Sequence, residues 1–178
     1  VKDYKPSIKW WNRMPFTSMM SSRGCPFQCT FCDSHITWTR KPRFRTAKNV
    51  VDELRYVTEE LGVKEVIFYD DILTLHKQRF EEMCDLIVKE KIDVTWGCLS
   101  RVDKIDRQIL EKSKKAGCHI MSFGLESGSE KMLKVINKGA NLTQAIDAIT
   151  LVRSYGIDTA ASFIFGMPGE TKETMRET

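Results

Sequence analysis

Three cysteines within eight residues place the strongest constraint on what this chain can form. Cys25, Cys29 and Cys32 follow the spacing C-x3-C-x2-C. Gly24 and Pro26 disfavour a regular helix or strand there, so the thiols belong to a short loop. Thiolate is the usual ligand of iron–sulfur clusters. Three thiolates can hold three irons of a cubane and leave the fourth iron open to a small molecule.

Two other uses of these cysteines are open. A structural zinc site needs four ligands, and His35, three residues after Cys32, completes a Cys3His set. A disulfide framework is disfavoured, because six cysteines in a chain of 178 residues without a signal peptide indicate a reducing compartment. We therefore expect a cytoplasmic protein, in which metal analysis separates iron from zinc.

Composition allows an ordinary globular domain and argues against two classes of function. The hydrophobic fraction is 42%, which is enough for a buried core. The net charge of +4 is mild, and we attribute it to Lys and Arg scattered over the expected helices. With no basic arm, nucleic acid is not an expected partner. No apolar run approaches the length of a membrane-spanning helix.

Helical and strand-like patterns alternate along the chain. Strands are expected at residues 17–21, 63–69, 93–99, 118–124 and 157–165, and helices at 46–61, 76–90, 106–117, 129–139 and 142–155, with a basic loop at 40–45. This alternation predicts an α/β fold with a parallel sheet and right-handed crossovers. A doubly wound sheet and a barrel both fit. The apolar run that ends the strand at 63–69 is typical of a strand covered on both faces.

Apolar residues at helical spacing predict which faces are buried. They are Val50, Leu54, Val57 and Leu61 in the first long helix, Phe80, Met83, Cys84, Ile87 and Val88 in the next, and Ala145, Ile146, Ile149 and Val152 in the last. Thr46 and Asp106 are expected helix N-caps. Cys84, Cys98 and Cys118 are expected to pack in the core as small hydrophobes.

Polar candidates follow the strands at their carboxyl ends. They are the three cysteines of the loop, Asp70 and Asp71, Ser100 and Arg101, Glu126, and Gly166. In (β/α) barrels this rim holds the active site. We therefore expect the functional site over the carboxyl ends of the strands.

The cysteine stretch, Arg-Gly-Cys-Pro-Phe-Gln-Cys-Thr-Phe-Cys at residues 23–32, resembles the signature of the radical S-adenosylmethionine (radical SAM) enzymes. It is most similar to the branch whose members often carry a cobalamin-binding domain upstream. Three later stretches match as well: Phe-Tyr-Asp-Asp at 68–71, Gly-Leu-Glu-Ser-Gly at 124–128 and Phe-Gly-Met-Pro-Gly-Glu-Thr at 165–171. The resemblance runs from about residue 17 to the C-terminus.

The resemblance implies an incomplete TIM-like (β/α)6 barrel, of which about five strand–helix units are present. The sixth strand is expected beyond Thr178, so the strand at 157–165 is expected to be an exposed edge. Residues 17–178 are then a radical SAM core truncated at its C-terminus, and residues 1–16 a linker from an upstream cobalamin-binding domain. Trp10 and Trp11 either cover an exposed edge or dock that upstream domain.

The implied activity is reductive cleavage of S-adenosylmethionine (SAM) on a [4Fe-4S] cluster, which gives methionine and a 5′-deoxyadenosyl radical. We expect cobalamin-dependent methylation or oxidative cyclisation at a carbon centre of a small-molecule or lipid-like substrate, with flavodoxin or ferredoxin as electron donor. A methylthiotransferase of tRNA or ribosomal protein is the alternative enzyme, although the paired aspartates and the lack of a basic tail argue against it. A zinc-stabilised binding module is the alternative from another class.

Roles in SAM binding follow from the resemblance. Glu126 is the candidate acceptor for both ribose hydroxyls. Phe31 would pack on the adenine, and Ser100 or Arg101 would meet the methionine carboxylate. Each assignment has a structural alternative: a surface carboxylate, an aromatic plug under the loop, and a local ion pair between Arg101 and Asp103.

The motif at the fifth strand departs partly from the family pattern, which often reads Gly-x-Ile-x-Gly-x-x-Glu. Ile164 and Gly166 match this pattern and are assigned to the cofactor site. Ser162 replaces the first glycine, and Glu170 falls one residue late. Gly166 and Gly169 are expected to permit close approach of the backbone to adenine.

The motif after the second strand departs more strongly. Many family members carry Gly-Gly-Glu there, where this chain has Tyr69, Asp70 and Asp71. We assign both aspartates to the cofactor site. The departure leaves the contact to the methionine amino group open, and it favours the cobalamin-associated branch, where paired aspartates are common.

Overall fold

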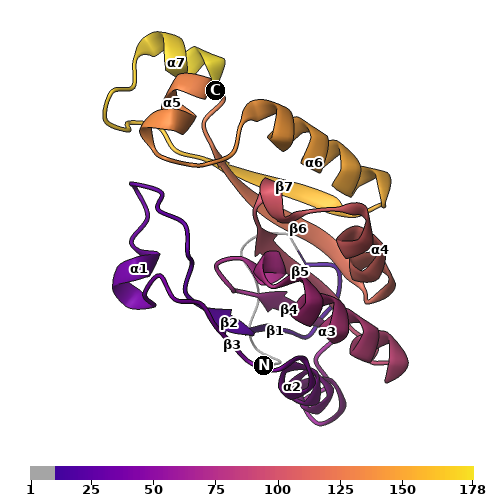
Figure 1. Cartoon of the computed structure of the whole chain (residues 1–178). Coiled ribbons are helices and arrows are strands. Elements are labelled where there is room, and N and C mark those ends of the chain that lie inside the picture. Colours follow the sequence, from indigo (N-terminus) through magenta and orange to yellow (C-terminus); the bar gives the residue numbers. More distant parts are fainter. Residues whose placement is uncertain (1–10) are drawn as a thin grey trace.

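Five strands form one parallel sheet, and the computed structural model describes residues 11–178 of the chain. The sheet has the order β1-β4-β5-β6-β7, with β1 at Phe16–Met19, β4 at Glu65–Phe68, β5 at Thr95–Ser100, β6 at Cys118–Glu126 and β7 at Asp158–Phe163. The crossovers contain α2 (Ala47–Glu59), α3 (Lys77–Lys89), α4 (Arg107–Lys115) and α6 (Leu142–Ser154), which lie on one side of the sheet (Figure 1). This confirms the predicted α/β fold with a parallel sheet.

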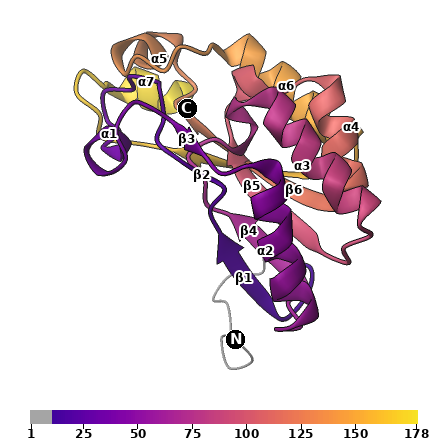
Figure 2. The same cartoon turned by 60° about the horizontal axis from the view of Figure 1, so that its bottom comes forward.

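The smaller elements gather at the carboxyl ends of the strands. They are α1 (Ser34–Thr37), α5 (Glu130–Val135), α7 (Lys172–Glu177), the 3-10 helices η1 (Leu73–Leu75) and η2 (Val102–Lys104), and the antiparallel pair β2 (Ser22–Arg23) and β3 (Arg43–Phe44). Figure 2 shows α1, α5 and α7 at this end of the sheet. Among residues 11–178, no helix has both the length and the apolar character needed to cross a bilayer.

The expectation of a loop at residues 40–45 is wrong for two residues. In β3, Phe44 lies opposite Ser22 and Arg43 opposite Arg23. The N–H of Arg45 also donates to the carbonyl oxygen of Ser21 at 3.0 Å. The returning chain thus satisfies backbone groups of the chain that enters the cysteine loop, a long-range pairing that no local pattern encodes.

Both predicted N-caps are confirmed. The side chain of Thr46 accepts a hydrogen bond from the N–H of Asn49 at the start of α2, at 3.2 Å. Asp106 accepts from the N–H of Ile109 at the start of α4, at 2.9 Å. Each cap satisfies a backbone donor that the first turn of a helix leaves free.

Most predicted core positions are buried, but Leu61, Val88 and Ile146 are exposed. Leu61 lies beyond the end of α2, and Val88 lies in the last turn of α3. In α6, Ala145 and Val152 are buried as expected and Ala148 joins them, while Ile146 is 66% exposed. Each residue advances by about 100° around the helix axis, which places Ile146 away from the face that these three residues form.

The two faces of the sheet differ in burial. The side toward the helices is packed with Val66, Phe68, Trp96, Met121 and Phe123, and Cys84, Cys98 and Cys118 are buried as predicted. The inner face borders a cavity of about 270 Å³, where Ile67 is only half-buried and Tyr69 is exposed. The expected cover on both faces of the strand at 63–69 is therefore wrong for the inner face, because the crossover helices of the described residues lie on the other side of the sheet.

β7 and β1 are the two edges of the sheet, so the described residues form an open sheet. Phe163, the last residue of β7, is 44% exposed. This agrees with the predicted exposed edge at 157–165. β7 pairs with β6 along one edge only, and no described strand pairs with its other edge.

A buried carboxylate closes the amino ends of the strands. Glu65, the first residue of β4, is fully buried, and one of its oxygens accepts from the N–H groups of Asn12 and Arg13, both at 2.7 Å. The hydroxyl of Thr95 lies 3.1 Å from the same oxygen, and Nε2 of His119 lies 2.9 Å from the other. The carboxylate therefore anchors the segment before β1 to the sheet.

Trp11 belongs to this anchored segment. Its ring stacks on that of Phe16, with 3.8 Å between the ring centroids, and it borders the cavity of the inner face. Trp10 lies outside the described residues. The proposed linker role of residues 1–16 stays a prediction.

Candidate functional site

Asp71 clamps the base of the cysteine loop. Its Oδ2 accepts from the N–H of Gly24 at 3.1 Å, and its Oδ1 accepts from the hydroxyl of Ser34 at 2.9 Å. Gly24 precedes the first cysteine and Ser34 follows the last, so one carboxylate holds both ends of the loop. Gly24 has φ of 97°, the left-handed conformation that glycine adopts without strain.

Asp70 fixes the chain that enters the loop. This buried carboxylate accepts hydrogen bonds from the N–H and hydroxyl of Ser21 and from the hydroxyl of Ser22. Arg79, also buried, donates to the carbonyl oxygen of Ser21 at 3.0 Å. Desolvation lowers the pKa of the Arg79 guanidinium, and the Asp70 charge opposes that shift. The paired aspartates therefore hold the loop in place through their own hydrogen bonds.

The tip of the loop is held by the segment after α5. The N–H of Thr30 donates to the carbonyl oxygen of Ile136 at 3.0 Å, and the amide of Asn137 donates to the carbonyl oxygen of Gln28 at 3.1 Å. The loop is thus attached to the rim at its base and at its tip. The cysteines are thereby joined both to the carboxyl end of β4, through Asp71, and to the segment that follows α5.

Arg101 connects the cysteine loop to the rest of the site. Its guanidinium lies over the ring of Phe27, 3.7 Å from the ring centroid, and its Nη1 lies 3.9 Å from the sulfur of Cys29. Its Nε pairs with Asp103 at 2.9 Å, and its Nη2 donates to the carbonyl oxygen of Lys138 at 2.8 Å. The ion pair with Asp103 is therefore present, and the same guanidinium also reaches a cysteine.

Glu126 ends β6 in an unusual conformation. Its φ is 69°, in the left-handed region that costs a non-glycine residue about 1 kcal/mol or more, and the register of β6 shifts between Gly124 and Glu126. The carboxylate folds back over Gly124, where a Cβ would collide with it. Strain of this kind persists where surrounding structure enforces it, and it clusters at functional sites.

Lys138 is the site residue that sequence reasoning missed. Its ammonium pairs with Oε1 of Glu126 at 2.9 Å, and both residues are buried, at 8% and 6% exposed. The same ammonium lies 5.8 Å from the ring centroid of Phe31, which is 40% exposed. A lysine in the connection between α5 and α6 has no sequence pattern that distinguishes it from a surface lysine.

The other predicted residues lie around this pair or below it. Ser100 is buried, and its hydroxyl is hydrogen-bonded to that of Thr74 in η1 at 2.6 Å. The N–H of Ile164 donates to the carbonyl oxygen of Glu126 at 2.9 Å. Gly166 has φ of 86° and open space around it, and its N–H donates to the carboxylate of Glu170. Phe31 and Arg101 thus contact Lys138, and Ile164 contacts Glu126, so the structure brings these three predicted residues to the buried ion pair.

The three thiols and His35 do not form a preassembled site for a single metal ion in the described residues. Within residues 11–178, no three His, Cys, Asp or Glu side chains converge on a point that would hold a single metal ion. Nδ1 of His35 instead lies 3.1 Å from the carbonyl oxygen of Cys32. The cysteines are free and partly exposed, and burial raises the pKa of the Cys25 thiol, so its ligation would release a proton.

Residues 19–178 match the model of the Radical SAM superfamily. The chain belongs to this superfamily. The predicted family is therefore confirmed, and a non-enzymatic zinc module is excluded. Because the radical SAM chemistry needs a [4Fe-4S] cluster and SAM, the three free thiols and the open side of the loop fit the cofactors that the family implies.

Three relatives illustrate the neighbourhood of the chain within the radical SAM superfamily. It is 38% identical over 165 residues to an uncharacterized methyltransferase of Pyrococcus horikoshii, covering 93% of this chain and 36% of the relative. It is 38% identical over 159 residues to the anaerobic magnesium-protoporphyrin IX monomethyl ester cyclase of Rubrivivax gelatinosus, covering 88% and 28%. It is 32% identical over 161 residues to a putative methylthiotransferase of Methanocaldococcus jannaschii, covering 84% and 35%. The chain spans about a third of the length of these relatives.

The radical SAM fold is also recognised in solved structures. The methyltransferase TsrM from Kitasatospora setae, with cobalamin and a [4Fe-4S] cluster bound, has a TM-score of 0.81 at 22% identity, covering 89% of this chain and 32% of that one. At this identity the likeness shows the fold alone. The five-stranded sheet therefore matches part of a radical SAM barrel, as predicted.

Proposed function

We propose that this chain is the core of a cobalamin-dependent radical SAM enzyme that methylates or oxidatively cyclises a carbon centre. The observation that carries the proposal is the three-cysteine loop at the rim of the sheet, with Arg101, Glu126 and Lys138 on one side of it. This choice of reaction is supported by two relatives, of which one is named a methyltransferase and the other a cyclase. It is also supported by the cobalamin bound in the TsrM structure. Cobalamin would be bound by a part of the protein outside this chain.

Cys25, Cys29 and Cys32 would each bind one iron of the cluster. When bound, the cluster supplies the electron that cleaves the carbon–sulfur bond of SAM. Arg101 places a positive charge 3.9 Å from the Cys29 sulfur, which favours the reduced form of the centre. Asp71 would act as a positioning residue. It holds both ends of the cysteine loop beside the carboxyl end of β4 and would not itself bind iron.

Glu126 and Lys138 would form the SAM-binding side of the site. The carboxylate would accept hydrogen bonds from both ribose hydroxyls, and the ammonium, released from the ion pair, would meet the methionine carboxylate. Phe31 would pack on adenine, close to the backbone of Ile164 and Gly166. The buried environment strengthens each of these polar contacts.

The cavity on the inner face would hold the reacting part of the substrate. It lies beside Leu99, Ile120 and Ser122, and its lining is mainly apolar. Such a lining excludes water and hydrogen donors that would compete for a reactive radical. This favours a small-molecule or lipid-like substrate.

The Glu126→Gln variant is expected to weaken SAM binding by about tenfold or more, because a hydrogen bond to a charged acceptor contributes about 1.5–3 kcal/mol. Calorimetry on the reconstituted protein measures this affinity, and circular dichroism checks that the fold is kept. Glu59→Gln, at an exposed position of α2, is the matched control and should bind SAM as the parent does. Equal affinities in all three proteins would remove Glu126 from the site.

Product analysis tests the proposed function. We expect the reduced, reconstituted protein to convert SAM to methionine and 5′-deoxyadenosine, and the full-length protein to bind cobalamin, seen in its visible absorption. Absence of SAM cleavage would contradict a radical SAM role for the site. Sulfur insertion into tRNA without any cobalamin would replace the proposal with the methylthiotransferase alternative, for which a relative is known.

A further inference from the structure

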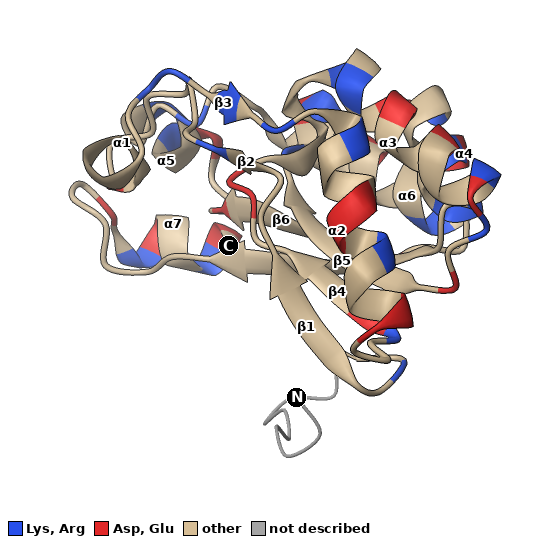
Figure 3. Cartoon of the chain, turned by 90° about the horizontal axis from the view of Figure 1, so that it is seen from below, with Lys and Arg blue, Asp and Glu red and all other residues tan. Residues whose placement is uncertain are grey.

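The net charge of the chain is concentrated in one segment. Residues 20–45 contain five of the 28 Lys and Arg but one of the 24 Asp and Glu, so the +4 of this segment equals the charge of the whole chain. The expectation of charge scattered over the helices is therefore wrong. Figure 3 shows blue positions on β3, on the loop before it and near β2, with red on the loop beside β2.

Two arginines in this segment oppose one another without a counter-charge. Arg23 and Arg43 are direct partners across the antiparallel pair β2 and β3, and both are exposed. Like charges placed directly opposite destabilise a strand pair. Within residues 11–178, neither guanidinium forms an ion pair, whereas the neighbouring Arg45 pairs with Glu53 at 2.5 Å.

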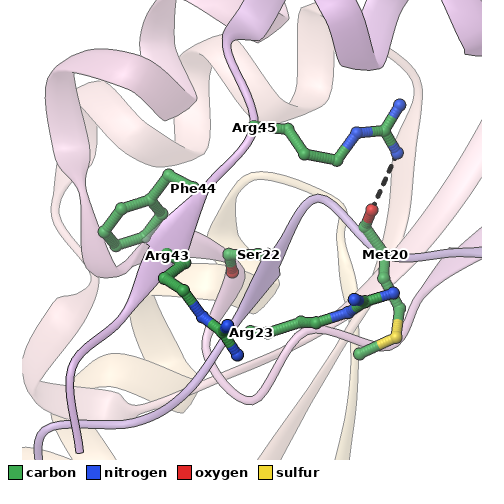
Figure 4. A pocket seen from close by; sticks show the side chains of 6 residues that line it. All are labelled: Met20, Ser22, Arg23, Arg43, Phe44 and Arg45. Atoms are coloured by element: carbon green, nitrogen blue, oxygen red, sulfur yellow. Dashed lines mark hydrogen bonds between the residues drawn. The ribbon is translucent and has the colours of Figure 1, made fainter. Parts of the chain in front are cut away.

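The arginines border a hollow of about 420 Å³. Figure 4 shows its lining, which is Met20, Ser22, Arg23, Arg43, Phe44 and Arg45. Arg45 is turned to the carbonyl oxygen of Met20, at 2.9 Å, and is thereby used within the fold. The guanidinium of Arg23 lies 5.0 Å from the ring centroid of Trp38. Its neighbour there is an aromatic ring and not a carboxylate. Two cations are thus held side by side for an anion from outside.

This basic surface adjoins the cysteine loop. Arg40 donates to the carbonyl oxygen of Phe27, which lies between the first two cysteines, at 2.5 Å. A Cβ on Gly24 would lie 3.1 Å from the carbonyl oxygens of Thr39 and Lys41. The chain that carries Arg40 and Lys41 therefore packs directly on the loop that would hold the cluster.

We propose that Arg23, Arg40, Lys41 and Arg43, the basic surface, dock an acidic one-electron carrier protein. The proposal rests on the proposed function, in which one electron passes from the carrier to the cluster, oxidising the carrier and reducing the centre. Electron-transfer encounters use small interfaces, and complementary charge raises their association rates. Four cations on one ribbon beside the electron acceptor match this requirement.

RNA is the competing class of partner for a basic surface, and the chain fits it less well. RNA-binding surfaces join basic residues to aromatic rings on which bases stack. Two aromatic rings lie beside these arginines, and each already faces a guanidinium: Trp38 that of Arg23, and Phe44 that of Arg79. Outside residues 20–45 the charges balance, so no basic stripe extends the surface.

Stopped-flow reduction of the reconstituted protein by reduced flavodoxin, an acidic carrier, tests the proposal. The R23Q/R43Q variant is expected to lower the second-order rate constant at low ionic strength by about tenfold or more, and to flatten its dependence on salt. K89Q/R153Q, which removes two exposed cations from the ends of α3 and α6, is the matched control and should react as the parent does.

Reduced methyl viologen, a small cation, is the second electron donor in this experiment. It should reduce the parent and R23Q/R43Q at equal rates, which shows that the cluster is intact in both. Equal rates with flavodoxin as well would overturn the docking surface while leaving the proposed function in place. Failure of viologen to reduce any of the proteins would overturn the cluster itself, and loss of RNA binding alone in R23Q/R43Q would assign the surface to RNA.

Discussion

Alanine in place of Cys25, Cys29 or Cys32 is expected to abolish cluster assembly and to leave the fold intact. Each thiolate would bind a separate iron, so the loss of one removes a ligand that no neighbour replaces. The three side chains are partly exposed and lie outside the packed core. Iron and sulfide analysis after anaerobic reconstitution should give about four irons for the parent and close to none for each variant.

Cys98→Ala provides the control for these variants. Cys98 lies within β5 and is buried in the core, where it packs as a small hydrophobe. Its loss should lower thermal stability and leave the iron content unchanged. Full iron content in all three loop variants, or a stoichiometric zinc ion in the parent, would contradict the assignment of the loop.

Glu65→Ala is expected to lower the free energy of unfolding by about 3 kcal/mol or more, because each buried donor left without its acceptor costs about 1–3 kcal/mol. The carboxylate is fully buried and accepts from Asn12, Arg13 and Thr95, with His119 at its other oxygen. Its removal leaves these donors without an acceptor and frees the segment that carries Trp11. Urea unfolding measures the change.

Two further variants separate this network from a general effect of losing a carboxylate. Glu59→Ala, at an exposed position of α2, should change the free energy of unfolding by less than about 0.5 kcal/mol. Glu65→Gln keeps an acceptor oxygen in place and should fall between the two alanine variants. A loss below about 1 kcal/mol for Glu65→Ala would show that the network does not stabilise the fold.

The fold could be predicted because its signals are local. Helical spacing, the caps at Thr46 and Asp106 and the alternation of strands and helices depend on neighbouring residues alone. The errors arose where packing decides. Ile146 is exposed because alanines face the core in α6, and β3 forms only because a distant segment returns to pair with it.

The candidate site could be proposed from the sequence where the residue type itself carries the chemistry. The three cysteines and Glu126 were chosen for that reason, and their roles stay predictions. Lys138 was missed because its role depends on a contact with Glu126 across twelve residues and on burial. The opposed pair Arg23 and Arg43 likewise becomes visible only when the register of β2 and β3 is known.

Electron paramagnetic resonance of the reduced protein is the most direct test for a three-cysteine cluster whose fourth iron is open to SAM. Addition of SAM is expected to change the spectrum of the reduced cluster in the parent, because a ligand would bind the iron that no cysteine holds. Glu126→Gln should need about tenfold more SAM, or more, for the same change. A spectrum that stays identical at saturating SAM, or a protein that takes up no iron, would contradict the account.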